Sequence, residues 1–185
     1  DSAGGLCRDR TDRAGRLTVA SSSSTTGTTR LLLAMALACV GSVAGALVSQ
    51  HVFDMQPCPW CVLQRVIYLA IAMLCLFGAA WSSIVARRGI GVLVLLLALS
   101  GAASALYQDL VASKSASCNL TFADKVISAL GLDGAFPPLL QVTANCSDAA
   151  VKLLGIQYAY WSLALFVMLA AASILVVASK PRRRH

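Results

Sequence analysis

The feature that most constrains this chain is a set of four long apolar runs. They cover about residues 31–48, 62–81, 90–110 and 156–177. Each approaches or reaches the roughly 20 residues needed to cross the core of a bilayer, where every backbone amide must be bonded within its own segment. The runs predict an all-α membrane protein, a bundle of four transmembrane helices. A soluble protein with four buried helices is the alternative, but only 12% of the residues are charged, about half the share typical of soluble domains.

The basic residues gather at the ends of the apolar runs, so the net charge of +7 does not indicate nucleic-acid binding. Residues 1–30 contain five arginines, an arginine pair separates the second and third runs, and residues 180–185 contain four lysines or arginines. Because basic segments are retained in the cytoplasm, both termini are predicted to be cytoplasmic. Segments of about 49–61 and 111–155 then lie outside, and the lipid bilayer surrounds the runs.

This topology divides the chain into three parts. Residues 1–30 lack an apolar period and are expected to form a disordered cytoplasmic tail. Residues 31–179 form the membrane domain, and residues 180–185 form a basic cytoplasmic tail.

The longer outer segment contains one amphipathic stretch. Residues 121–130 place four apolar side chains on one face, namely Phe122, Val126, Ile127 and Leu130. Gly131 can end a helix. The stretch therefore predicts a short interfacial helix lying on the membrane surface, and a plain loop is the alternative.

Four of the seven cysteines fall in the two outer segments. Cys58-Pro59-Trp60-Cys61 precedes the second run, whereas Cys118 and Cys146 lie in the longer segment. Disulfides persist outside the cytosol, and strained exposed ones are redox-active. Cys61 stands at the start of the second helix, where the helix dipole favours a thiolate. These four cysteines are the predicted catalytic residues.

Arg65 lies one helical turn beyond Cys61 on the same face. An arginine at membrane depth is costly and usually functional. It can stabilise a Cys61 thiolate and bind an oxygen atom of a ligand at the membrane edge. The alternative is an arginine that merely snorkels to the interface.

Two cysteine pairs beside a bilayer favour an electron relay. An outer protein dithiol would reduce the pair Cys118 and Cys146, which would then reduce Cys58 and Cys61. The chain carries no flavin, haem or iron–sulfur motif, so the acceptor should be lipid-soluble, and a quinone fits. Purely structural disulfides and a four-cysteine zinc site are alternatives, but the second pair lacks the close spacing of zinc folds, so no metal is expected.

At these residues the chain resembles the disulfide bond formation protein B (DsbB) family, over about residues 31–180. The resemblance rests on Gln50-His51-Val52, Gln56-Pro57-Cys58-Pro59-Trp60-Cys61 with Gln64-Arg65, the pair Cys118 and Cys146, and Leu154-Gly155 ahead of Trp161. It implies an enzyme of the bacterial inner membrane that reoxidises a periplasmic DsbA-like dithiol protein. The two electrons would pass to the membrane quinone pool, as ubiquinone or menaquinone, and sustain periplasmic disulfide formation.

The resemblance also implies roles for single residues. Cys118 would form the mixed disulfide with the DsbA-like protein, and Cys146 would be its partner. Cys61 would interact with the quinone, and Arg65 would help to bind it, with Gln50 and His51 as further candidates.

One departure concerns the outer end of the third helix. Some family members carry a histidine there, whereas this chain has Tyr107-Gln108-Asp109, which leaves the other quinone contacts open. Two alternative functions remain. One is a vitamin K epoxide reductase-like enzyme, in which the loop pair precedes the CxxC. The other is a non-enzymatic membrane scaffold with structural disulfides.

Overall fold

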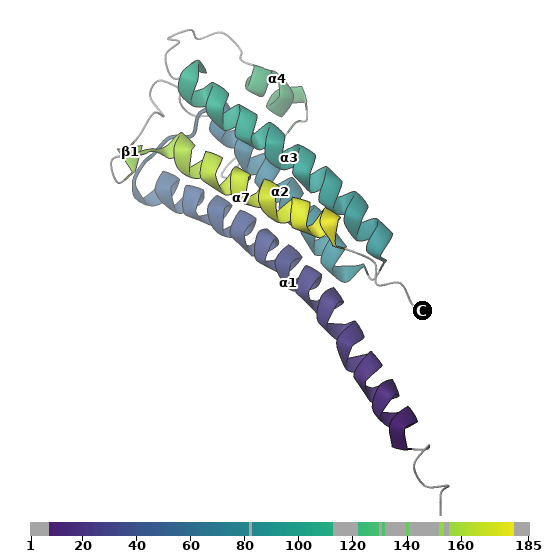
Figure 1. The fold of residues 1–185 in the computed structure, drawn as a ribbon. Helices are drawn as coiled ribbons and strands as arrows, with labels where there is room; N and C mark the ends of the chain where they lie inside the picture. Colours follow the sequence, from purple (N-terminus) through teal and green to yellow (C-terminus); the bar gives the residue numbers. More distant parts are fainter. Residues whose placement is uncertain are drawn as a thin grey trace, which may run out of the picture.

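Long helices dominate the computed structural model, which describes residues 8–81, 83–112, 122–129, 131, 140, 152–153 and 156–179. Four helices carry a segment long and apolar enough to cross a membrane. They are α1 (Arg8–Val52), α2 (Pro59–Ala80), α3 (Ile84–Leu110) and α7 (Tyr158–Ala178). The predicted bundle of four transmembrane helices is therefore confirmed (Figure 1).

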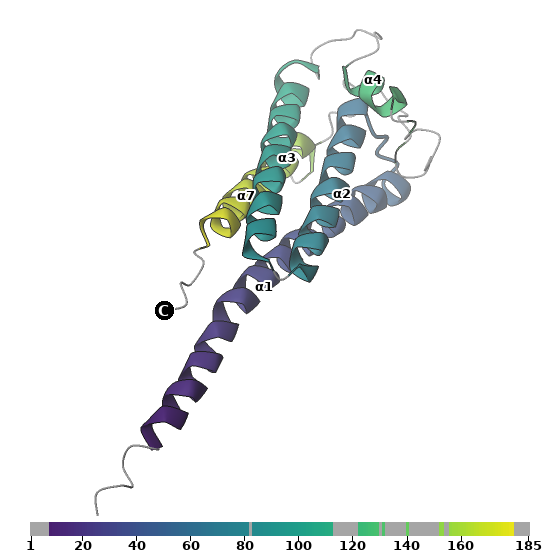
Figure 2. The ribbon, with the colours of Figure 1, turned by 90° about the vertical axis from the view of Figure 1, so that its right-hand side faces the viewer.

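The helix α1 extends well beyond the bundle at its N-terminal end. Its apolar span begins at Thr26, but the helix itself begins at Arg8, inside the stretch expected to be a disordered tail. Figures 1 and 2 show this first part of α1 projecting away from the other helices. Adding residues to an existing helix avoids the cost of nucleation, so a helix held by packing can continue into polar sequence.

The core of the bundle receives side chains from all four long helices. Leu32 on α1, Ile71 on α2, Val94 on α3 and Phe166 on α7 are fully buried in one apolar cluster. The helix α3 packs mainly on α7 and α1 mainly on α2, while contacts between α2 and α3 join the two pairs. Every long helix also turns large apolar side chains outward, which suits a protein surrounded by lipid.

Gly101 allows close packing of α3 on α7. A side-chain carbon at Gly101 would overlap the ring of Phe166, so the ring lies directly against the α3 backbone. The same ring stacks on Tyr68 of α2, with centroids 4.3 Å apart and planes 5° apart. This contact joins three helices beneath the candidate active site.

The arginine pair between the second and third spans lies in the first turn of α3. Arg87 Nε donates to the carbonyl oxygen of Trp81 at 2.7 Å, and Arg88 donates twice to that of Ser179, at 2.6 and 3.2 Å. These carbonyls follow the ends of α2 and α7, where backbone acceptors lack helical partners. The two arginines therefore fasten three helix ends together.

The opposite end of the bundle carries a short helix, α4 (Phe122–Ala129), and a small antiparallel ladder of β1 (Lys152–Leu153) with β2 (Ile156–Gln157). Figures 1 and 2 both place α4 at the end of the bundle where α2 begins. Because β2 occupies the first two residues predicted for the fourth helix, α7 begins only at Tyr158.

The helix α4 lies within the predicted stretch, and its packed face includes Ile127 of the predicted face but Ala123 in place of Phe122. Ala123 and Ile127 are 0% and 2% exposed and lie against the start of α2, whereas Phe122 is 68% exposed. The predicted face included Phe122 because periodicity alone cannot show where a neighbouring helix lies. Gly131 follows with a φ of 62°, the left-handed conformation expected of a helix-ending glycine. The position of α4 at the membrane surface stays a prediction.

Candidate active site

The CxxC motif forms the first turn of α2. Cys58 is the N-cap residue with an extended backbone, and its Sγ accepts a hydrogen bond of 3.4 Å from the Cys61 amide. Pro59 occupies the first helical position, where its fixed φ suits the helix and its missing N–H costs nothing. The local sequence thus folds the two cysteines onto one turn.

The two sulfur atoms of this turn lie 2.8 Å apart, so a disulfide bond of about 2.05 Å needs only a small rotation of the side chains. Cys58 is completely buried, beside Trp60, Ala112 and Ala123, whereas Cys61 is partly exposed. The ring of Trp60 packs on that of Tyr107, with centroids 4.8 Å apart. The motif is therefore fixed against α3 and α4, and only Cys61 faces the adjoining pocket.

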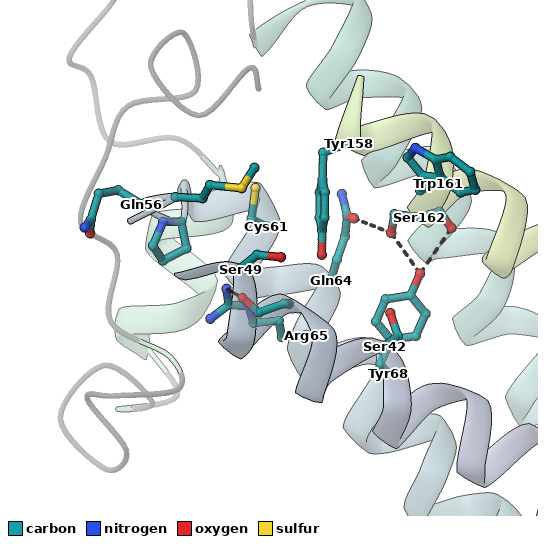
Figure 3. Close-up of a pocket in the computed structure, with 13 residues that line it drawn as sticks. Ser42, Ser49, Gln56, Cys61, Gln64, Arg65, Tyr68, Tyr158, Trp161 and Ser162 are labelled. Atoms are coloured by element: carbon teal, nitrogen blue, oxygen red, sulfur yellow. Dashed lines mark hydrogen bonds between the residues drawn. The ribbon is translucent and has the colours of Figure 1, made fainter. Parts of the chain in front are cut away.

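That pocket is a cavity of about 120 Å³ lined by residues of α1, α2, α7 and the α1–α2 connection. Its polar lining includes Ser42, Ser49, Gln64, Arg65, Tyr158 and Ser162. Its apolar lining includes Ala46, Met55, Pro57 and Trp161. Figure 3 shows Cys61 at the rim and the hydroxyl group of Tyr158 directed into the pocket.

Arg65 brings a positive charge to the pocket and is only 6% exposed. Its guanidinium donates to Gln50 Oε1 at 2.9 Å and to the carbonyl oxygen of Ala46 at 3.5 Å, both on α1. The positive charge of Arg65 interacts electrostatically with the Cys61 sulfur and the Tyr158 hydroxyl. The structure thus brings Arg65 and Cys61 to one pocket, as their spacing predicts.

A chain of hydrogen bonds through buried polar side chains ends at the Cys61 sulfur. Gln108 Nε2 donates to Cys61 Sγ at 3.2 Å, and Gln64 Nε2 donates to Gln108 Oε1 at 2.8 Å. Ser162 Oγ donates to Gln64 Oε1 at 2.6 Å and lies 2.8 Å from the Tyr68 hydroxyl. Figure 3 shows the part of this chain between Gln64, Ser162 and Tyr68. A continuous hydrogen-bonded chain therefore links side chains of α2, α3 and α7 to one sulfur.

The remaining predicted residues fall in different places. Gln50 contacts Arg65 and does not line the pocket, while His51 is exposed at the end of α1 and also lies off the pocket. Cys118 and Cys146 lie outside the described residues. Their pairing and their roles stay predictions.

Sequence reasoning missed Gln108, Tyr68, Tyr158 and Ser162 as site residues. One signal was available for Tyr68, because it follows Cys61 by seven residues and Gln64 by four, so the three side chains share one face of α2. A second signal was the polarity of Gln108 and Ser162 inside apolar spans, where polar side chains usually face the bundle interior. Neither signal could show that they meet at Cys61.

Comparison with known proteins identifies the family of the chain. The family model "Disulfide bond formation protein DsbB" matches residues 28–176. Disulfide bond formation protein B 1 of Pseudomonas savastanoi pv. phaseolicola is 37% identical over 160 residues, covering 84% of this chain and 91% of that protein. Its namesake in Pseudomonas aeruginosa PAO1 is 35% identical over 150 residues, covering 79% and 92%.

A more distant relative shows the same extent of likeness. Disulfide bond formation protein B of Aromatoleum aromaticum is 32% identical over 161 residues, which cover 83% of this chain and 94% of that protein. The predicted family is thus confirmed over nearly the whole length of these relatives. The chain belongs to the DsbB family of disulfide bond formation proteins, and is accordingly a multi-pass protein of the bacterial inner membrane with disulfide oxidoreductase activity.

Proposed function

We propose that this protein oxidises a periplasmic DsbA-like dithiol protein and passes the two electrons to a membrane quinone. In the net reaction the partner protein loses two electrons and two protons and gains a disulfide, and the quinone becomes a hydroquinone. The observation that carries the proposal is Cys61, a partly exposed sulfur beside a buried sulfur, at the rim of a pocket that also holds Arg65.

The entry to the relay is proposed to be the pair Cys118 and Cys146. A thiolate of the partner attacks their disulfide, forms a mixed disulfide with Cys118 and releases Cys146 as a thiolate. The second thiol of the partner then displaces Cys118, so the partner leaves oxidised and the pair is left reduced. The reduced pair in turn reduces the disulfide of Cys58 and Cys61 by the same thiol–disulfide exchange.

The exit from the relay is proposed to be the pocket at Cys61. A quinone ring is flat and largely apolar, with two carbonyl oxygens that accept hydrogen bonds. The pocket offers donors in Arg65 and Tyr158 and apolar contacts in Met55 and Trp161, so its residues fit such a ring. The bound quinone supplies the two-electron acceptor, whereas the protein holds Cys61 and the positive charge of Arg65 beside it. Gln50 acts by orienting Arg65, whereas His51 lies off this pocket.

The sidedness of the relay follows from charge. Basic residues mark one end of the bundle in three places: the N-terminal part of α1, the start of α3 with Arg87 and Arg88, and the sequence that follows α7. By the positive-inside bias this end faces the cytoplasm, so the CxxC turn and α4 face the periplasm. In this orientation α4 lies at the periplasmic membrane surface.

The test is turnover by the purified protein with a reduced DsbA-like protein and either ubiquinone or menaquinone. We expect quinone reduction that matches the disulfide formed in the partner, two electrons for each. Cys61→Ser should abolish quinone reduction, and Cys118→Ser should abolish capture of the partner as a mixed disulfide. Normal turnover by either variant would refute the role given to that cysteine, and a quinone left oxidised by the wild type would refute the proposal.

A further inference from the structure

The hydrogen bonds that lead from Ser162 to the Cys61 sulfur share one direction. Ser162 donates to Gln64, Gln64 donates to Gln108, and Gln108 donates to the Cys61 sulfur. The Tyr68 hydroxyl can donate to Ser162, through either its Oγ at 2.8 Å or its carbonyl oxygen at 3.1 Å. Every link therefore points its hydrogen toward the sulfur. This is the arrangement that a negatively charged sulfur requires, because a thiolate can only accept hydrogen bonds.

The side chains of this hydrogen-bonded chain are buried, which strengthens their hydrogen bonds. Gln64 and Gln108 are 4% and 6% exposed, and Ser162 is 8% exposed, all within membrane-spanning helices. Hydrogen bonds in such a low-dielectric interior are stronger than in water and polarise one another along a chain. A hydrogen bond to an ionised group is also stronger than one between neutral groups. Since carboxamides pass protons poorly, the chain is suited to stabilising charge rather than to conducting protons.

We propose that Gln108 is a catalytic hydrogen-bond donor that stabilises the thiolate of Cys61, and that Gln64 is a positioning residue that fixes the Gln108 amide with its N–H₂ group toward the sulfur. Arg65 is held on the α1 side of the site, whereas Gln108 reaches the sulfur from α3. The proposal rests on the proposed function, in which this thiolate is the group that reduces the quinone. It adds a donor that the motif containing Cys61 and Arg65 does not include.

The test measures the reactivity of Cys61 without quinone. In a protein carrying Cys58→Ser, Cys118→Ser and Cys146→Ser, iodoacetamide alkylates Cys61 at a rate proportional to the thiolate fraction at that sulfur, followed by the mass of its peptide. We expect Gln108→Leu to slow alkylation at pH 7 about ten-fold, equivalent to about 1.4 kcal/mol. The rates of variant and parent should converge near pH 10, where the thiol ionises without help.

Further variants separate this role from a structural one. Gln64→Leu should give a smaller loss, because the Gln108 amide keeps its donor but loses the group that orients it. Gln108→His keeps an N–H donor and should recover most of the rate. Ser100→Ala, an exposed position on the same helix whose hydroxyl bonds only its own turn, should react like the parent.

A hydrogen bond between Cys61 and Gln108 that runs in the opposite direction would overturn the proposal. If the Cys61 thiol donates to Gln108 instead, Gln108→Leu should react at an unchanged or higher rate at pH 7. An equal slowing at all pH values, not recovered by Gln108→His, would show a merely structural role and overturn it as well. Quinone reduction is assayed separately, so a protein that shows the Gln108 effect but never reduces quinone would refute the proposed function and not this inference.

Discussion

At the scale of single residues, Arg65 shows how a cation is held inside this bundle. Its guanidinium donates hydrogen bonds to Gln50 Oε1 and to the Ala46 carbonyl oxygen, so α1 helps to orient a side chain whose backbone belongs to α2. The resemblance predicts Gln50 as a quinone contact, which stays a prediction, and the structure shows that its Oε1 accepts a hydrogen bond from Arg65. The charge beside Cys61 therefore depends on residues of two helices.

Arg65→Ala should mainly raise the apparent KM for quinone. A hydrogen bond from a charged donor contributes about 1.5–3 kcal/mol, so we expect an increase of about ten-fold or more with a smaller change in kcat. Steady-state turnover at varied quinone concentration measures this. Arg30→Ala removes an exposed arginine from the far end of the α1 span and serves as the control. An unchanged KM in Arg65→Ala would remove this residue from the quinone site.

At the scale of elements, the close packing of α3 on α7 uses glycines of α3, and Gly101 is the one that lies against an aromatic ring. Gly101 lets the Phe166 ring lie on the α3 backbone, and the ring in turn stacks on Tyr68, whose hydroxyl contacts Ser162. A shift of this ring would therefore reach the hydrogen-bonded chain that ends at Cys61. Tyr68 therefore connects the packing of the helix core to the hydrogen bonds at the Cys61 pocket.

Gly101→Ala should destabilise the bundle because the added carbon overlaps Phe166. Overpacking of this kind typically costs about 1–3 kcal/mol. Thermal unfolding in detergent, followed by tryptophan fluorescence, should show a lower midpoint than the wild type. Gly45→Ala is the matched control, since an added carbon there meets nothing within 4 Å. Equal midpoints for the two variants would contradict the role given to Gly101.

The short helix α4 shows what periodicity can and cannot give. The sequence predicted a helix in this stretch and its glycine stop, and both are present. The buried face is set by Ala123 and Ile127, because these residues meet the beginning of α2. Phe122 has a larger apolar ring but remains exposed. A pattern of apolar residues indicates that a helix has a preferred face, whereas the neighbouring helix decides which residues are covered.

At the scale of the whole molecule, the two ends of the bundle differ in chemistry. One end carries Arg87 and Arg88, which bind the backbone oxygens that close α2 and α7. The other end carries the CxxC turn, the pocket and α4 (Figure 2). The proposed relay requires this separation, because it places the thiol partner and the basic segments on opposite sides of the membrane.

The orientation of the protein in the membrane can be measured with two variants, each carrying one introduced reporter cysteine in an otherwise cysteine-free protein. Phe53→Cys lies in the exposed connection between α1 and α2, and Ser83→Cys lies in the exposed connection between α2 and α3. In intact cells, a maleimide that cannot cross the inner membrane should label the first reporter. The second should be labelled only after the membrane is permeabilised. The reverse pattern would place the CxxC turn in the cytoplasm and refute the proposed relay.

The sequence by itself determined the features that depend on local order. Four apolar runs can only be spanning helices in lipid, and a cysteine pair ending at a helix start puts Arg65 one turn below Cys61. These conclusions hold because helical geometry relates residues three or four positions apart, whatever surrounds them. For the same reason the family could be recognised from a few short motifs.

Only the tertiary structure decided which residues of different helices meet. Gln108 reaches Cys61 across 47 positions of sequence, and Ser162 reaches Gln64 across 98. Such contacts depend on how far each helix is rotated and how closely it approaches its neighbour, as Gly101 allows at Phe166. Local periodicity carries no information about that rotation, so the donors around the Cys61 sulfur became visible only once the helices were packed.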